Sequence, residues 1–529
     1  MAVGLITCLA IGVFLFGGGA VHLARRLLRT TGPTVGPVPT LDLPAPPAAL
    51  YVAPRLVHAL VNADPGLADR GPRPEPADLR FYAYGSTSLI HLRGALATDW
   101  QLANPDQASV SGYGGSISVV PGDPLDFHLT GHDPSARLDV FRVGAHDAVH
   151  LLTVPGIGVS PQPQALPRPT DGLVEEGWPV SYRLVVPGDW QSGVYLAKLT
   201  GSSGGDSYVL FVVRVTTAPP LLVVVPTMTY EAYNSYGGAS LYDWTAGPRS
   251  HADRVSFDRP FDRQDGAGLL FRYDFPLIVW LEDHGYSPGY ITDVDLAAHP
   301  ELASGSRTIL LSGHSEYWTR SMRDAMERSA GAGAGLGFFG ANNAFWQVRL
   351  EAGSGTGPDR TIVCYKDSGR DPISATDPSA ATLRFSSAEV QRPPRQLIGQ
   401  PYGGIVDGLA ALTIGRGMAT FAPDVGLRPG DMLPDLVVGE VDRADARDRL
   451  APRLLLGETP VVVHEQPRPI FAGMSLWVRP AGGRIFDAGT FGFSWGLDPR
   501  YAAALPGFPA DAFANLTARV LAWLGTQPR

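Results

Sequence analysis

The sequence predicts a protein that combines an all-β part with an α/β part, preceded by an N-terminal membrane anchor. Three observations support this fold class. An uncharged apolar run opens the chain, residues 79–218 form short β-rich segments separated by turn signals, and from residue 220 onward apolar strands alternate with helical patterns. We therefore expect an antiparallel β-sandwich followed by a mostly parallel sheet with helices packed on it.

Residues 1–30 predict a transmembrane anchor or a signal-like segment. The first 24 positions carry no charged residue, and three arginines follow by position 29. A cleaved signal peptide normally has its positive charge before the apolar core, so a retained single span is favoured. The arginines favour a cytoplasmic location for the rest of the chain, whereas the Pro-rich linker at 31–54 is typical of a spacer that holds a domain off a membrane. The side of the membrane is left open.

Composition sets the scale and excludes several classes of protein. The 529 residues are 44% hydrophobic, which is enough for two domains with buried cores. The net charge is −9 and the only lysines are Lys198 and Lys366, so no basic cluster indicates a nucleic-acid partner. With Cys8 and Cys364 as the only cysteines, neither a disulfide framework nor a cysteine-based zinc site is expected.

The region 79–218 is expected to form the β-sandwich. No helical periodicity of useful length interrupts it, and Pro219 and Pro220 mark its boundary with the next domain. We expect the two domains to have separate cores. The strand-like segments are SISVVPGD (116–123), LDFHLTG (125–131), RLDVFRVG (137–144), SYRLVVPGD (181–189), YLAKLT (195–200) and YVLFVVRV (208–215).

The region 220–529 is expected to form the α/β domain. Buried strands are predicted at LLVVVP (221–226), RTILLSG (307–313) and GLGFFGAN (335–342), and further strands at PVVVHEQ (460–466), RPIFAGM (468–474) and RIFDAGTFGF (484–493). Helices are predicted at FPLIVWLEDHG (275–285), TRSMRDAMERSA (319–330) and 509–523.

Polar clusters follow three of these strands, at the sheet edge where parallel α/β proteins bind ligands. Four tyrosines follow the first strand within thirteen positions, the sequence HSEYW follows the second, and two asparagines follow the third. A tyrosine-rich loop alone more often packs at a domain interface, but three clusters at one edge favour a functional site. The residues are Tyr230, Tyr233, Tyr236, Tyr242, His314, Ser315, Glu316, Tyr317, Trp318, Asn342 and Asn343.

Hydrolytic triads fit these clusters poorly. The run from Gly313 to Tyr317 follows a strand and precedes a helix, but Tyr317 replaces the second glycine of a nucleophile elbow, and His464 is the only later histidine. No histidine follows Ser494 in GFSWG, and Cys364 lacks flanking glycines. Phenol and carboxylate oxygens remain, and these hard ligands suit a cation such as ferric iron better than zinc.

Five motifs in the chain resemble the N,N-dimethylformamidase large (beta) subunit family. They are AYNSYGGASLYDW (232–244), ILLSGHSEYWT (309–319), FFGANNAFWQ (338–347), VVGEVDR (437–443) and AGTFGFSWGL (488–497). SISVVPGD, FRVG and SGVYLAKL also resemble the sandwich that precedes this domain in the family. The resemblance covers about residues 81–523, and it implies class I glutamine amidotransferase-like layering of the α/β domain.

The resemblance also implies a site and a reaction. The family's amidase uses a mononuclear iron, and its ligands match Tyr233, Tyr242 and Glu316, with Tyr230 and Tyr236 as rival tyrosines. The histidine, asparagine and second glutamate that assist hydrolysis match His314, Asn342 and Glu440. The substrate implied is a small amide or related C–N compound, and the family's amidase also works with a small partner subunit.

Two hypotheses about function are therefore kept. The first is a membrane-anchored, metal-dependent hydrolase of an amide or related C–N bond, possible as a homo-oligomer. The second is a noncatalytic cell-envelope protein whose aromatic crevice binds a carbohydrate or a peptide, as the anchor, the linker and the ten tryptophans would also allow. Bound metal discriminates between the two.

Overall fold

The computed structural model describes residues 99–528, except residues 246, 355–356, 445–452, 465, 467 and 481. The expected membrane span at 1–30, the linker at 31–54 and the first part of the expected sandwich lie outside these residues. Within the described ranges, no helix has both the length and the apolar character that a bilayer span requires.

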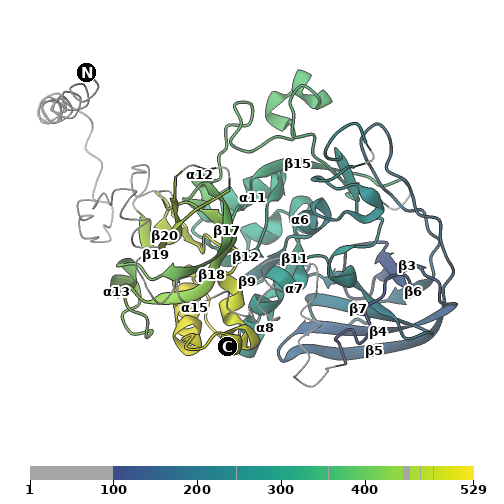
Figure 1. Cartoon of the computed structure of the whole chain (residues 1–529), viewed down its shortest axis with the longest axis horizontal. Helices are drawn as coiled ribbons and strands as arrows, with labels where there is room; N and C mark the ends of the chain where they lie inside the picture. The colour runs from purple at the N-terminus through teal and green to yellow at the C-terminus, as the bar shows by residue number, and fades with distance from the viewer. Residues whose placement is uncertain are drawn as a thin grey trace, which may run out of the picture. The chain divides into compact units, whose positions relative to one another are not determined.

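Two sheets pack against each other in the N-terminal part of the described chain and form a β-sandwich (Figure 1). The larger sheet has the strand order β2-β8-β7-β4-β5 and the smaller one β1-β3-β6. Neighbouring strands are antiparallel, except β2 and β8, which run parallel. The strands are β1 (Ser111–Gly114), β2 (Ser118–Val119), β3 (Pro124–Thr130), β4 (Ser135–Gly144), β5 (Asp147–Gly158), β6 (Tyr182–Val185), β7 (Gly193–Gly201) and β8 (Asp206–Val213).

Strand β8 is buried on both of its faces, which explains its almost continuous apolar sequence. Val209, Phe211 and Val213 point into the sandwich interior. The alternate residues, Tyr208, Leu210 and Val212, belong to a second core on the other face of the sheet.

This second core is shared with the α/β part of the chain, so the expectation of two separate cores is wrong. The Trp100 ring lies 5.7 Å from the Phe271 ring and 5.3 Å from the Phe275 ring, both of which follow the predicted boundary. An ion pair of 2.8 Å between Arg142 and Glu282 adds a polar link. Sequence periodicity separates the sheets at Pro219, but it does not show that the outer face of the sandwich is also covered.

The largest sheet contains seven strands in the order β11-β9-β12-β14-β21-β20-β19. The first five run parallel, and β20 and β19 extend the sheet in antiparallel fashion. The segment PVVVHEQ contributes less than predicted, because β19 ends at Val461. The bounds are β9 (Leu221–Val225), β11 (Gly289–Thr292), β12 (Thr308–Gly313), β14 (Gly335–Gly340), β19 (Arg453–Val461), β20 (Ile470–Val478) and β21 (Arg484–Asp487).

Helices cover both faces of this sheet. Leu222 and Val224 of β9 pack in one core with helices α9, α10 and α11, whereas Val223 and Val225 pack in the other core with α7, α8 and α15. Successive side chains of the strand therefore point to opposite faces of the sheet, and each face packs against its own layer of helices. The helices are α7 (Leu270–Tyr273), α8 (Phe275–Asp283), α9 (Asp293–Ala298), α10 (Glu301–Ser304), α11 (Arg320–Gly331) and α15 (Ala510–Leu524).

Two smaller sheets are also present in the described part of the chain. One has the order β10-β16-β15-β13, and the other is the antiparallel pair β17 and β18. Their bounds are β10 (Arg254–Ser256), β13 (Tyr317–Thr319), β15 (Trp346–Glu351), β16 (Thr361–Val363), β17 (Tyr402–Thr413) and β18 (Met432–Asp442). The short helices are α6 (Thr227–Ala232), α12 (Arg395–Ile398), α13 (Gly417–Phe421) and α14 (Pro499–Ala504), and the 3-10 turns are η2 (Tyr236–Gly238), η3 (Arg263–Gly266), η4 (Pro372–Ala375), η5 (Pro378–Ala380) and η6 (Phe493–Leu497).

Candidate functional site

The carboxyl ends of β9, β12 and β14 lie at one edge of the parallel sheet, and the segments that follow them carry five of the six predicted site residues. Tyr233 directly follows α6, and Tyr242 comes nine residues later. His314 and Glu316 lie in the turn after β12, and Asn342 follows β14. The sixth residue, Glu440, is supplied by β18.

The turn that carries His314 and Glu316 connects β12 to the three-residue strand β13, and the predicted helix begins after this strand, at Arg320. Gly313 has a φ of 57°, and a Cβ atom there would lie 2.1 Å from the Tyr273 Cβ, so the position requires glycine. The Thr229 hydroxyl accepts a 3.0 Å hydrogen bond from the Glu316 amide and links α6 to this turn.

Two phenols converge on the Glu316 carboxylate. The Tyr242 phenol lies 2.8 Å from each carboxylate oxygen, and the Tyr233 phenol donates to Oε2 at 3.0 Å. The two tyrosine rings stack with their centroids 4.5 Å apart. Two phenol oxygens and one carboxylate therefore form a compact face of three oxygen-bearing groups.

His314 lies between this oxygen face and a second carboxylate. Its Nε2 is 3.1 Å from the Tyr233 hydroxyl, 3.2 Å from Glu316 Oε2 and 3.9 Å from Glu440 Oε2. The Phe491 ring packs against the imidazole at 4.5 Å. Burial alone lowers the pKa of His314, but the Glu440 and Glu316 carboxylates outweigh burial and raise it above the usual value.

Asn342 and Glu440 form the far side of the site. The Asn342 side-chain amide donates to Glu440 Oε2 at 2.5 Å. The Asn342 backbone has a φ of 51°, and its amide donates to the Asp442 carboxylate at 3.1 and 3.2 Å. Asn342 Oδ1 is buried and accepts no hydrogen bond within the described part of the chain. A buried acceptor of this kind indicates where a polar ligand could bind.

The two carboxyl groups have opposite protonation behaviour. Burial raises the pKa of Glu316, but the His314 hydrogen bond and charge, together with the charge of Lys366, bring it below the usual value. Burial and the nearby charge of Glu316 raise the pKa of Glu440 to about 7. Glu316 is thus an ionised acceptor near neutral pH, whereas Glu440 can gain or lose a proton there.

Sequence reasoning missed Lys366, which lies against the site. Its Nζ is 3.8 Å from the centroid of the Tyr242 ring and donates to the Leu241 carbonyl at 2.8 Å. Burial lowers the pKa of Lys366. The sequence did offer one signal. The chain has only two lysines, so each of them is a candidate for a specific role.

The rival tyrosines lie elsewhere. The Tyr230 phenol donates to the Asp274 carboxylate in the core, and the Tyr236 ring packs edge-on against Trp178 at 6.5 Å. The serine nucleophiles considered from the sequence are also engaged in structural contacts. Ser315 Oγ accepts from the Trp318 indole at 2.9 Å, and Ser494 Oγ donates to the Tyr273 carbonyl at 2.8 Å.

The oxygen face has the chemistry to hold a hard cation. Burial, followed by the Glu316 charge, raises the pKa of both Tyr233 and Tyr242, so these phenols stay protonated until a positive charge joins them. Their oxygens lie 2.8 to 3.0 Å from those of Glu316, close to the spacing that ligands of one ion adopt. Among described residues, no cluster of three or more His, Cys, Asp and Glu side chains could hold a metal.

Comparison with known proteins places the chain in a family. The family model described as N,N-dimethylformamidase beta subunit-like, C-terminal, matches residues 137–504, which is more than half of the chain. The chain belongs to this dimethylformamidase-like family. The match contains all six predicted site residues and Lys366.

Other comparisons add little to the family assignment. No curated protein matches the sequence. Among solved structures, a cycloisomaltooligosaccharide glucanotransferase from Paenibacillus sp., complexed with cycloisomaltoheptaose, is similar over 22% of this chain and 15% of that chain, with 17% identity and a TM-score of 0.12. A likeness this small carries no argument about the fold or the activity of the dimethylformamidase-like chain.

Proposed function

We propose that this dimethylformamidase-like protein is a metal-dependent hydrolase of a small amide or a related C–N bond, with a mononuclear iron as its cofactor. The observation that carries the proposal is the convergence of two phenols on one buried carboxylate, with a histidine 3.2 Å from that carboxylate and a second carboxylate 3.9 Å from the histidine. Tyr233, Tyr242 and Glu316 are the residues that would hold the iron. Bound there, the metal would polarise the amide carbonyl or lower the pKa of the attacking water.

Glu440 is assigned the proton transfers. With its pKa raised to about 7 by burial and the charge of Glu316, its carboxylate can take a proton from water at Oε2. The same group, once protonated, can deliver that proton to the leaving nitrogen. Its position 3.9 Å from His314 Nε2 lets the imidazolium stabilise the ionised form before the first step and after the second.

His314 and Asn342 are assigned positioning and charge stabilisation. His314 Nε2 bridges the oxygen face and Glu440, so a proton on this atom offsets the charge of both carboxylates. The Asn342 amide is fixed through its backbone by Asp442 and can donate to negative charge that develops on the carbonyl oxygen. Both roles require little movement, because each side chain is nearly inaccessible to solvent.

The burial of the site favours a small substrate. His314, Glu316 and Asn342 are each at most 3% exposed, whereas Tyr242 is 37% exposed and brings one edge of the site to the surface. A compact amide can reach such a site more readily than a polymer. Family membership supports the choice of an amide, and dimethylformamide is the first compound to test.

The decisive experiment combines elemental analysis with hydrolysis of a panel of small amides. Purified protein should contain about one iron per chain and release amine from at least one amide, and chelation should remove both properties. His314→Ala should retain iron and lose turnover, because it is not among the residues assigned as ligands. Protein that binds no iron after reconstitution and cleaves no amide would instead support the noncatalytic cell-envelope alternative.

We also propose that residues 1–30 attach the protein to a membrane through a single span. The support is the uncharged apolar sequence and the arginines that follow it. Membrane fractions should contain the full-length chain, and a variant that lacks the first 30 residues should move to the soluble fraction. Equal partitioning of the two forms would reject this attachment.

A further inference from the structure

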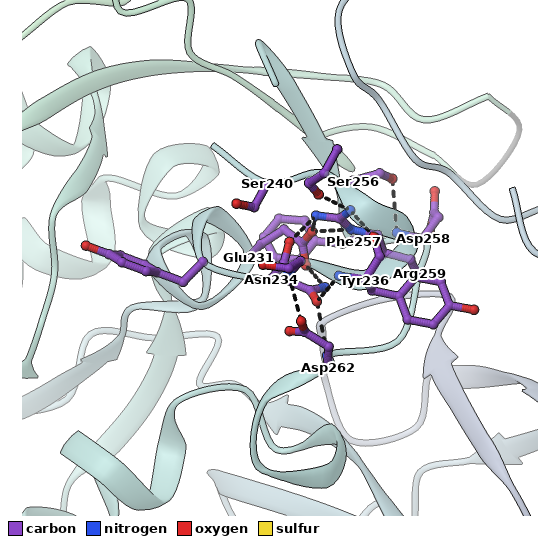
Figure 2. Close-up of polar contacts among 12 residues, drawn as sticks. Glu231, Asn234, Tyr236, Ser240, Ser256, Phe257, Asp258, Arg259 and Asp262 are labelled. Carbon is purple, nitrogen blue, oxygen red and sulfur yellow. Dashed lines mark hydrogen bonds and ion pairs between the residues drawn. The ribbon is translucent and has the colours of Figure 1, made fainter. Parts of the chain in front are cut away.

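A buried polar cluster makes hydrogen bonds to the loop that links the two site tyrosines, and Figure 2 shows its side chains. We call residues 233–242 the tyrosine loop. The Arg259 and Glu231 side chains form an ion pair of 2.6 Å and are both completely inaccessible to solvent. Glu231 is in α6, two residues before the tyrosine loop begins, and Arg259 follows β10. The cluster therefore connects the small four-stranded sheet to the loop.

The Arg259 guanidinium binds the backbone of the tyrosine loop at three points. Its Nη1 donates to the Tyr236 carbonyl at 2.8 Å and to the Ala239 carbonyl at 2.9 Å. Its Nη2 donates to the Asn234 carbonyl at 2.9 Å. The loop turns tightly between these points, where Gly237 and Gly238 have φ values of 75° and 91°. One planar cation thus fixes the spacing of carbonyls on both sides of the turn.

Side chains of the loop complete the restraint. Asn234 donates to Glu231 Oε2 at 3.0 Å and to the Pro260 carbonyl at 2.9 Å. The Ser240 hydroxyl accepts hydrogen bonds from the Tyr242 amide at 3.0 Å and the Asp243 amide at 2.9 Å. The Leu241 amide donates to the Ala232 carbonyl at 3.1 Å, which closes the loop beside its starting point.

Closure of the loop determines where the two phenols lie. Tyr233 and Tyr242 are brought side by side at opposite ends of the loop, so their rings stack and both phenols reach Glu316. Neither tyrosine contacts Arg259 itself in the hydrogen bonds of the cluster, which are made to loop residues between them. A shift of these carbonyls would change the separation of the two phenol oxygens.

Burial of an arginine with a single carboxylate contributes little net free energy to the stability of a fold. Burial removes the hydration of both charges, and apolar residues of similar size often stabilise a protein at least as well. A defined position for bound groups is a better reason for such a pair, because the guanidinium fork fixes the directions of its acceptors. The acceptors here are backbone carbonyls of the loop that links the two site tyrosines.

We propose that Arg259, held by Glu231, is a positioning residue that sets the separation of the Tyr233 and Tyr242 phenols and so prepares the oxygen face for its cation. The identity of the cation rests on the proposed function, but the placement of the phenols does not. Ser240 acts in the same framework at the Tyr242 end of the loop. Loss of either contact should loosen Tyr242 from Glu316 and leave the rest of the fold intact.

The test compares Ser240→Ala and Arg259→Lys with Ser256→Ala in the full-length chain. Ser256 is the matched control, because it is also fully buried and its hydroxyl also accepts from a backbone amide, that of Asp258, outside the tyrosine loop. Tyrosine nitration by tetranitromethane, mapped by mass spectrometry, reports phenol accessibility without any metal. Visible absorption of iron-reconstituted protein reports tyrosinate bound to iron.

Nitration of Tyr242 should rise at least fivefold in Ser240→Ala and Arg259→Lys, and it should stay at the wild-type level in Ser256→Ala. The iron-tyrosinate band should weaken in the first two variants only. If Tyr242 is nitrated at the wild-type level in Ser240→Ala, the proposal is overturned. This outcome decides the question even when Arg259→Lys does not fold. If the wild-type protein shows no iron band, the proposed function fails, while nitration still decides whether this framework positions the phenols.

Discussion

The two faces of the candidate site use a carboxylate in opposite ways. On one face, Glu316 receives hydrogen bonds from two phenols and lies near two cationic side chains, which keep its pKa low. On the other face, burial and the charge of Glu316 raise the pKa of Glu440 to about 7, although the Asn342 amide donates a hydrogen bond to it. The difference indicates that the first carboxylate is suited to bind a cation and the second to carry a proton.

Removal of Glu316 should have the largest effect on metal binding and turnover. In Glu316→Ala the phenols lose their common acceptor, so we expect iron content and amide hydrolysis to fall below detection. Metal analysis after reconstitution and an amine-release assay measure the two effects. A Glu316→Ala protein that retains iron and full turnover would contradict the assignment of this face.

Replacement of Glu440 on the other face should separate iron binding from proton transfer. Glu440→Gln keeps the shape of the side chain but cannot carry a proton, so kcat should fall about 10²- to 10⁴-fold. Iron content should stay at the wild-type level, because Glu440 is not assigned as a ligand. Loss of iron in this variant would show that Glu440 belongs to the oxygen face instead.

The pH dependence of turnover should identify the proton carrier. As a base, Glu440 acts only when ionised, and its pKa is raised to about 7 by burial and by Glu316. The rate should therefore rise as the pH increases through about 7 and fall about tenfold for each unit below it. The residual activity of Glu440→Gln, assayed over the same pH range, should lack this limb. A limb of unchanged midpoint in Glu440→Gln would assign it to another group.

Replacement of Lys366 should have a smaller effect than replacement of Glu316 or Glu440. In Lys366→Met the cation 3.8 Å from the centre of the Tyr242 ring is lost while the apolar stem remains. A cation against the face of an aromatic ring favours extra negative charge on the phenol, so its removal should lower turnover about tenfold. The energy of the iron-tyrosinate band should shift as well. An unchanged band and rate would make Lys366 a packing residue only.

Sequence reasoning grouped five of the six candidate residues because they follow strands, whereas Glu440, which lies within β18, was suggested only by the family resemblance. Parallel strands end at a common edge, so the position of Glu316 after one strand and of Asn342 after the next predicts that the two side chains lie near each other. The same reasoning could not choose among the tyrosines. Tyr230 and Tyr233 are only three residues apart, and the choice depends on where the short helix α6 ends.

Contacts that span long stretches of sequence were less predictable. Lys366 reaches Tyr242 from a segment more than 120 residues away, where no motif marks it. The shared core was missed for the same reason, since the outer face of β8 is covered by Phe271 and neighbouring side chains from a later segment. Periodicity reports that a face is buried, but it does not report which element covers it.

The visible spectrum of the iron-reconstituted protein and of two phenylalanine variants tests directly whether the two phenols bind the metal. We expect one iron per chain with an iron-tyrosinate band that weakens in Tyr233→Phe and in Tyr242→Phe and persists in Glu440→Gln. A band of wild-type intensity in both phenylalanine variants, or bound iron without any such band, would contradict the assignment of the two phenols to the metal-binding face.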